Sequence, residues 1–149
     1  MIPLRPFVTA DTDAVAEFWV RAWNTTMPQF DFQARRPWLL EHLQKACAEH
    51  AAIMVAGEPA SGLLMLWPVT GELDQLAVDP PAWGTGVAEA LMGWAKARCG
   101  DALWLDVNQD NPRAVAFYSR HGFKIDTAGV NPGGLLPIWR MRLDANRGP

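Results

Sequence analysis

The sequence predicts a mixed α/β domain built on one central sheet. Apolar residues recur at helical spacing in several segments, and between these segments the pattern changes to short apolar runs typical of strands. The 149 residues, 50% of them hydrophobic and 19% charged, suffice to bury one core but not two independent ones. We therefore interpret residues 1–149 as a single domain.

The chain is expected to begin with a strand and two helices. Residues 2–8 form the opening strand, and Thr9-Ala10-Asp11 supplies a cap and a first-turn acid for the first helix. One apolar stripe of this helix consists of Val15, Phe18, Trp19, Ala22 and Trp23. A loop over residues 24–31 leads to a second helix over residues 37–50, where proline is tolerated in the first turn.

Three strands and a strong helix follow. Apolar runs at residues 52–56 and 63–67 are joined by a turn-rich segment typical of a hairpin. A third strand over residues 72–78 ends at Asp79-Pro80-Pro81, because proline cannot donate to a sheet ladder. The helix over residues 87–99 stops at Gly100.

The C-terminal part alternates strands with one more helix. A strand over residues 103–107 precedes Asn111-Pro112, a cap followed by a proline that starts a helix running to about residue 121. The remaining segments are a strand at 123–126, a loop at 129–134, a last strand at 137–143 and a polar tail at 144–149, which we expect to fray.

Composition and charge exclude several classes of protein. A net charge of −3 argues against a nucleic-acid or anionic-membrane binder, and the longest apolar runs are too short to span a bilayer. Cys47 and Cys99 are too few for a disulfide framework, which favours a reducing, cytoplasmic location. Cys47 is expected in the core, and the histidines lack the spacing of a metal site, so no metal is expected.

The segment from Leu76 to Ala88 carries the strongest functional signal. It joins a strand, a glycine-containing turn and a helix start, an arrangement that binds phosphate through backbone N–H groups and the helix dipole. The spacing Gly84-x-Gly86 alone also fits a plain tight turn. A dinucleotide fingerprint would need a third glycine or alanine where Glu89 stands, and no Gly-Lys-Ser/Thr of a P-loop is present.

Two blocks resemble the GNAT superfamily of N-acetyltransferases. The run from Glu72 to Pro80, followed by Trp83-Gly84-Thr85-Gly86-Val87-Ala88, is similar to its acyl-CoA motif [Q/R]-x-x-G-x-[G/A]. Trp83 departs from this motif, because glutamine or arginine is usual there. The second block, Leu105-x-Val107, Asn111-x-x-Ala114, Phe117-Tyr118 and Gly122-Phe123, is similar to the family's next segment.

The resemblance implies a central mixed sheet of about six to seven strands flanked by about four helices. It also implies direct acetyl transfer from acetyl-CoA to a primary amine in a ternary complex, with the Leu76 N–H polarising the thioester and Val78 pairing with pantetheine. The implied CoA-binding residues are Leu76, Ala77, Val78, Trp83, Gly84, Thr85, Gly86, Val87, Ala88, Asn111, Ala114 and Tyr118.

The amine must lose a proton before attack, so a base or a base-held water is expected near the strand. Glu72 is the first candidate for the catalytic base. By strand alternation it shares a face with Asp74, Leu76 and Val78, unless a bulge, typical of the family, shifts the phase. Both carboxylates also fit the solvated end of a strand.

Other side chains receive roles from the same resemblance. Tyr118 matches the tyrosine that protonates the leaving thiolate, although the position also fits a core aromatic residue. Asn111 resembles a pantetheine contact and is equally a good N-cap. Trp19, Trp23 and Phe30 flank the loop that covers the acceptor in this family, so they are candidates for an amphipathic amine pocket, together with Asp74.

Two questions about function stay open at this stage. A small-molecule amine is favoured as acceptor over a protein N-terminus or lysine, because the chain is one acidic domain. The alternative to an enzyme is a sensor module that binds acyl-CoA without turnover, which the unusual Trp83 motivates. Homodimers are common in the superfamily, so a homodimer is compatible with the resemblance.

Overall fold

The computed structural model describes residues 2–131 and 136–143. Its centre is a seven-stranded mixed sheet in the order β1-β2-β3-β4-β5-β7-β6. The strands are β1 Leu4–Pro6, β2 Ala52–Ala56, β3 Gly62–Trp67, β4 Glu72–Val78, β5 Trp104–Asn108, β6 Phe123–Val130 and β7 Pro137–Leu143. The helices are α1 Thr12–Thr26, α2 Arg36–Ala48, α3 Val87–Cys99 and α4 Pro112–Arg120. The expected mixed α/β architecture is confirmed.

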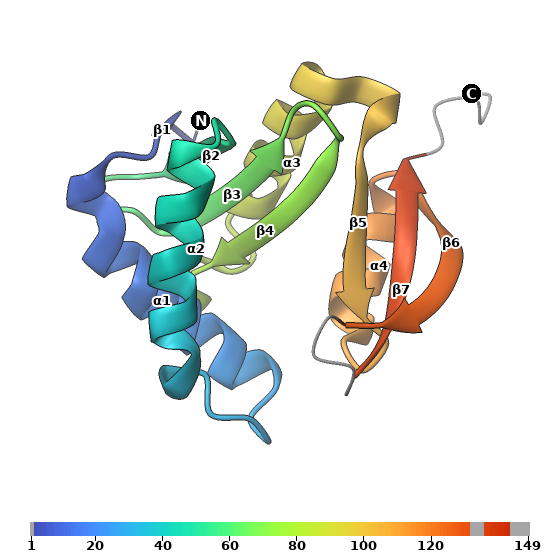
Figure 1. Ribbon diagram of the computed structural model, residues 1–149, viewed down its shortest axis with the longest axis horizontal. Helices are drawn as coiled ribbons and strands as arrows, with labels where there is room; N and C mark the ends of the chain where they lie inside the picture. The colour runs from blue at the N-terminus through green and yellow to red at the C-terminus, as the bar shows by residue number, and fades with distance from the viewer. Residues whose placement is uncertain (1, 132–135, 144–149) are drawn as a thin grey trace.

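Helices cover the two faces of the sheet, and each face has its own core (Figure 1). On one side α1 and α2 pack over β2, β3 and β4, with Phe18 and Leu39 fully buried. On the other side α3 packs against the sheet around Leu91 and Met92. In Figure 1 the front of β5, β7 and β6 carries no helix.

The sheet separates in its middle. β4 and β5 run parallel and pair only at Glu72 and Trp104 among the described residues, whereas every other pair of neighbouring strands is antiparallel and matched over at least three positions. Beyond this position the two strands diverge towards their C-terminal ends (Figure 1). The backbone edges of β4 and β5 that face each other there are therefore available to a ligand.

A bulge interrupts the alternation of β4. Met65 pairs with Gln75 but Leu66 pairs with Leu73, which leaves Asp74 as the extra residue. Asp74 and Gln75 consequently both face the helices α1 and α2, while Leu76 and Val78 pack on the α3 side. We expected Glu72, Asp74, Leu76 and Val78 to share one face of the strand. Because of the bulge, this expectation is wrong for Leu76 and Val78, which lie on the opposite face from Asp74.

Several boundaries differ from the sequence-based expectation. α1 continues to Thr26 into the expected loop, and β1 is confined to Leu4–Pro6. β6 extends to Val130 because it pairs with β7 along its whole length. The expected loop at 129–134 therefore begins two residues later, residues 132–135 lie outside the described residues, and so does the tail at 144–149. Cys47 is exposed, since it lies on the outer side of α2, so its expected place in the core is wrong.

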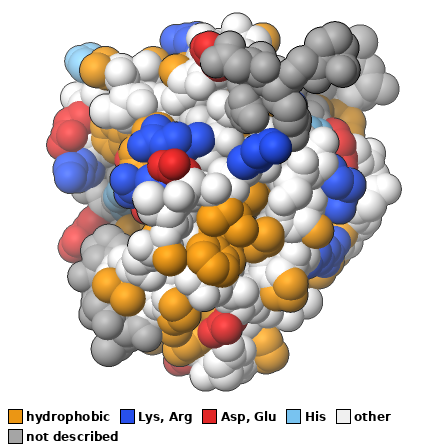
Figure 2. Space-filling model, turned by 90° about the vertical axis from the view of Figure 1, so that its right-hand side faces the viewer, with side chains coloured by type: hydrophobic (Ala, Val, Ile, Leu, Met, Phe, Trp, Pro, Cys, Tyr) orange, Lys and Arg blue, Asp and Glu red, His pale blue; other side chains and the backbone are white. Residues whose placement is uncertain are grey.

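The edge strand β6 forms the side of the molecule seen in Figure 2. All its residues after Phe123 are exposed, and Ile125 and Val130 keep 50% and 62% of their surface in contact with solvent. Figure 2 shows hydrophobic side chains gathered in the middle of this side, with basic side chains above them. None of the described helices is long and apolar enough to cross a membrane.

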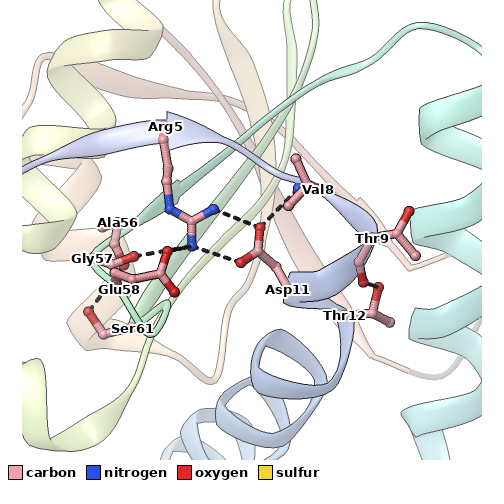
Figure 3. A network of polar contacts seen from close by, with 9 residues as sticks. All are labelled: Arg5, Val8, Thr9, Asp11, Thr12, Ala56, Gly57, Glu58 and Ser61. Carbon is pink, nitrogen blue, oxygen red and sulfur yellow. Dashed lines mark hydrogen bonds and ion pairs between the residues drawn. The ribbon is translucent and has the colours of Figure 1, made fainter.

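A polar network fastens β1 to the start of α1 (Figure 3). The Arg5 guanidinium donates to both carboxylate oxygens of Asp11, at 2.9 and 2.7 Å, and to the Gly57 carbonyl at 3.3 Å. Asp11 also accepts the backbone N–H of Val8 at 2.9 Å. These bonds lower the pKa of Asp11, the Arg5 hydrogen bond most of all, so this nearly buried carboxylate stays ionised.

Candidate active site

A cavity of about 280 Å³ lies where β4 and β5 diverge. Its walls come from the end of β4, the start of α3, the inner side of α4 and the last turns of α1. The predicted CoA-binding residues that line it are Leu76, Ala77, Val78, Trp83, Gly84, Gly86, Val87, Ala88, Asn111, Ala114 and Tyr118. Thr85 is the exception, since its exposed side chain bonds back to the Ala82 carbonyl.

The turn before α3 places backbone amides at the cavity. Gly84 and Gly86 have φ values of 78° and 95°, a conformation that residues with a Cβ rarely adopt. Gly86 is the N-cap of α3 and no side chain caps the helix. The first N–H groups of α3 therefore have no partner within the helix, and with the helix dipole they can hold an anionic phosphate group.

Trp83 uses its side chain for structure. Its indole N–H donates to the Val78 carbonyl at 2.8 Å, which ties the turn to the end of β4. The Arg113 guanidinium of α4 lies over the indole ring, 4.1 Å from the ring centroid, and also lines the cavity. At position 83, where the acyl-CoA motif usually has glutamine or arginine, this protein therefore has an indole ring on which Arg113 stacks.

Tyr118 reaches the cavity from α4. Its ring packs edge-on against Phe117 and Phe123, with centroids 5.5 and 5.8 Å away. Burial raises the pKa of Tyr118 to about 12, so the hydroxyl carries its proton at neutral pH. No hydrogen bond joins this hydroxyl to another described residue, which leaves it free to donate a proton to a ligand.

Asn111 acts as the N-cap of α4. Its side-chain oxygen accepts the backbone N–H of Ala114 at 3.2 Å, and the side chain is buried at the cavity wall. The capping role is therefore present in the structure. The side-chain amide N–H₂ group is not used in this bond, so a contact with a ligand is compatible with the cap.

A second cavity, of about 600 Å³, lies between α2 and the start of β4. It is lined by His42, Lys45, Glu49, His50, Trp67, Pro68, Val69, Thr70, Glu72 and Asp74. Glu72 is half-buried, and its carboxylate has no hydrogen bond or ion pair within the described part of the chain. Burial raises the pKa of Glu72, and the negative charges of Asp74 and Asp106 raise it further.

Asp74 is held in place by three donors. His42 Nε2 lies 3.0 and 2.9 Å from its two oxygens, Trp67 Nε1 donates at 2.7 Å and Gln75 Nε2 at 3.2 Å. Burial alone would raise the pKa of Asp74, but the hydrogen bonds from His42 and Trp67 outweigh it and lower the pKa. Asp74 is thus a fixed anion, whereas Glu72 is an unpaired carboxylate.

The aromatic residues that we expected to line the acceptor pocket, Trp19, Trp23 and Phe30, lie in different places. Trp19 is buried and donates its indole N–H to Gln75 at 3.1 Å, and it lines neither cavity. Trp23 lines the first cavity instead of the second. Phe30 is 40% exposed and packs edge-on against Phe32 near the end of α1, outside both cavities.

Sequence reasoning did not assign a role in the site to His42, Trp67, Gln75 or Arg113. The helical spacing of Trp38 and His42 on α2 was the available signal, because residues four apart share one helix face. Their rings are stacked, with centroids 4.7 Å apart. Nothing in the local sequence of α2 points to Asp74, since that contact joins two elements that are far apart in the sequence.

The sequence of the chain matches that of a known family. The sequence profile of the acetyltransferase (GNAT) family matches residues 13–123, most of the chain. The chain belongs to the GNAT family. The matched range includes the bulged strand β4 and the glycine turn before α3, as well as Asn111 and Tyr118 on α4.

Individual GNAT proteins resemble different parts of the chain. An uncharacterized N-acetyltransferase of Mycobacterium bovis is 46% identical over 59 residues, 37% of this chain and 38% of that protein. A mycothiol acetyltransferase of Salinispora tropica is 35% identical over 118 residues, which cover 68% of this chain and 36% of that protein. The chain therefore spans well under half the length of both relatives.

A third relative matches the chain along most of its length. The peptidyl-lysine N-acetyltransferase YjaB of Escherichia coli is 26% identical over 126 residues, 84% of each protein. Its ligand-free solution structure superposes with a TM-score of 0.77 at 24% identity, covering 95% of this chain and 97% of YjaB. This likeness supports the same GNAT fold.

Proposed function

We propose that this GNAT protein transfers an acetyl group from acetyl-CoA to a primary amine, directly and within a ternary complex. The observation that supports this most is the cavity between β4, α3 and α4, which gathers the predicted CoA-binding residues except Thr85. It joins an anion-binding helix start to a protonated tyrosine. The unpaired carboxylate Glu72 lies further along the same strand, in the second cavity.

The first cavity holds acetyl-CoA in this proposal. The amides of Gly86, Val87 and Ala88 bind the pyrophosphate, and the diverging edge of β4 pairs with pantetheine through Val78. The Leu76 N–H, just after the bulge, polarises the thioester carbonyl. When the carbon–sulfur bond breaks, Tyr118 donates its proton to the sulfur, which its raised pKa permits at neutral pH.

The second cavity receives the acceptor amine. The carboxylate of Glu72 attracts the ammonium group and, directly or through a water, is our first candidate for the base that removes its proton. A raised pKa brings this carboxylate closer to the range in which a base works at neutral pH. Asp74 shapes the acceptor side of this cavity, and Trp23 adds apolar surface to the first cavity, whereas Trp19 and Phe30 line neither cavity and receive no role in this proposal.

A small-molecule amine is the proposed acceptor class, and a lysine or N-terminus of a protein is the second candidate. The relatives support both classes, because one bears the name mycothiol acetyltransferase and another peptidyl-lysine N-acetyltransferase. The second cavity, about 600 Å³, is large enough for a small-molecule amine or for the side chain of a lysine. We propose no role for nucleic acid or membrane.

The test is thiol release from acetyl-CoA across amines, amino acids, polyamines, aminoglycosides and short lysine peptides. We expect release with one acceptor class, and a lower rate for Glu72→Gln with unchanged acetyl-CoA affinity. Asp101→Asn, which changes an exposed acid in the turn that follows α3 and lies outside both cavities, is the control. Acetyl-CoA binding without release for any acceptor would instead favour the sensor function.

A further inference from the structure

His42 and Asp74 form a hydrogen-bonded pair that has no part in the proton transfers described above. The imidazole Nε2 of His42 lies 2.9 Å from Asp74 Oδ2 and 3.0 Å from Oδ1. The ring also stacks on Trp38, with centroids 4.7 Å apart and planes inclined by 14°. One side of the ring is thus fixed by a carboxylate and one face by an indole, so its orientation is well defined.

The carboxylate determines which nitrogen carries the proton. In a neutral imidazole one nitrogen donates a hydrogen bond and the other accepts one. The ionised carboxylate of Asp74 has no proton to donate, so it can act only as an acceptor. Nε2 is therefore the donor and Nδ1 keeps its lone pair. Nδ1 has no hydrogen-bond partner among residues 2–131 and 136–143, and His42 lines the second cavity together with Glu72.

We propose that His42, oriented by Asp74, removes the proton from the acceptor ammonium, while Glu72 binds that ammonium through its charge. This inference rests on the proposed acetyl transfer and refines the role given there to Glu72. The N–H bond of the ammonium breaks and an N–H bond forms at Nδ1, so the amine lone pair becomes free to attack the thioester. The imidazolium then lies against the Asp74 carboxylate, which stabilises it.

The surrounding charges fit this division between the two carboxylates. The charged and titratable groups around His42 are Glu72 and Asp74 of β4, Lys45, Glu49 and His50 of α2 and its end, and Arg35, whose guanidinium lies over the Trp38 ring. Beyond Glu72, Asp106 of β5 is paired with Arg140 of β7 at 2.9 Å. Within this set Asp74 has a lowered pKa and Glu72 a raised one, a separation typical of groups with different roles in proton transfer.

His42→Gln is the first variant to test. Glutamine favours a helix, and its amide can still donate to Asp74, so the pair's hydrogen bond is retained while the base is lost. We expect kcat/KM to fall about 10²-fold or more with acetyl-CoA affinity unchanged, and the acid limb of the pH profile to move. His121→Gln, at the end of α4 and in neither cavity, is the matched control and should retain activity.

Two further variants separate a base from a structural histidine. In His42→Ala, added imidazole should restore part of the rate, because a free imidazole can occupy the vacated space. In Asp74→Asn, the amide can donate to Nε2 and place the proton on Nδ1, so kcat should fall while folding is kept. Folding of each variant is checked by its cooperative thermal transition.

The outcomes are distinguishable from a failure of the proposed function. If His42→Gln keeps kcat/KM within about twofold of the original protein and the same pH profile, His42 is not the base and acetyl transfer stands. A loss that imidazole does not restore and that leaves the pH profile unmoved would also overturn the inference. If the unaltered protein acetylates no amine, the proposed function itself fails.

Discussion

Two carboxylates on one short strand have opposite properties in this protein. Glu72 and Asp74 are separated by one residue, yet burial and the neighbouring charge of Asp74 raise the pKa of Glu72, whereas hydrogen bonds lower that of Asp74. The difference arises from the donors: Asp74 has three and the Glu72 carboxylate has none among the described residues. At the scale of residues, the partners around a side chain determine its chemistry more than its residue type does.

Tyr118→Phe tests the proposed acid. The exchange removes only the hydroxyl, which makes no hydrogen bond with the described residues, so the packing against Phe117 and Phe123 is kept. We expect kcat to fall by about 10²-fold, the usual contribution of a general acid, with the Kd of acetyl-CoA and the Tm nearly unchanged. Steady-state kinetics and equilibrium binding measure both, and an undiminished kcat would remove Tyr118 from the mechanism.

At the scale of elements, the site depends on how β4 ends and where it bulges. The strand over residues 72–78 and the helix over residues 87–99 were predictable with their bounds, because proline, glycine and apolar spacing mark them locally. The position of the bulge is not marked by residue type, since it is fixed by pairing between β3 and β4. The bond between His42 and Asp74 could not be predicted for the same reason, because it joins α2 to β4.

The contact between β1 and α1 gives a prediction for stability. Asp11→Asn removes the charge that holds Arg5 and weakens the hydrogen bond to Val8, so the free energy of unfolding should fall by about 2 kcal/mol at pH 7. Asp13→Asn is the control, because the Asp13 side chain is exposed and its carboxylate lies 3.9 Å from the Arg36 guanidinium. This exchange should change the free energy of unfolding little. Urea unfolding followed by circular dichroism measures both.

The pH dependence of this contact has a defined sign. The pKa of Asp11 is lower in the folded protein than its usual unfolded value of about 4, so its stabilisation is complete above that value. As the pH falls through the folded pKa, the carboxylate is protonated and the stabilisation is lost. The difference in unfolding free energy between the original protein and Asp11→Asn should therefore shrink towards zero in acid, and a constant difference would contradict this account.

At the scale of the whole molecule, the sheet consists of two parts joined at one position. β1 to β4 with α1, α2 and α3 form one part, and β5, β7 and β6 with α4 form the other. In the described ranges β4 pairs with β5 only at Glu72 and Trp104, although side chains of both parts share the core on the α3 side. The first cavity, the proposed acetyl-CoA site, lies between these parts, because its lining comes from β4 and α3 on one side and from α4 on the other. A ligand bound there contacts both parts and should hold them together.

Acetyl-CoA should therefore stabilise the folded protein, and Gly86→Val should weaken this effect. Binding to the native state alone adds about 2.7 kcal/mol at a ligand concentration 100 times Kd, which raises the Tm. Valine at position 86 cannot easily adopt the φ of 95°, so the amides at the start of α3 move and acetyl-CoA binds less tightly. Gly93→Ala, an exposed site in the interior of α3 with open space around it, is the matched control: it should raise the ligand-free Tm and keep the full shift. Thermal unfolding with and without acetyl-CoA measures these shifts, and an equal shift in Gly86→Val and the original protein would place the phosphate site away from this turn.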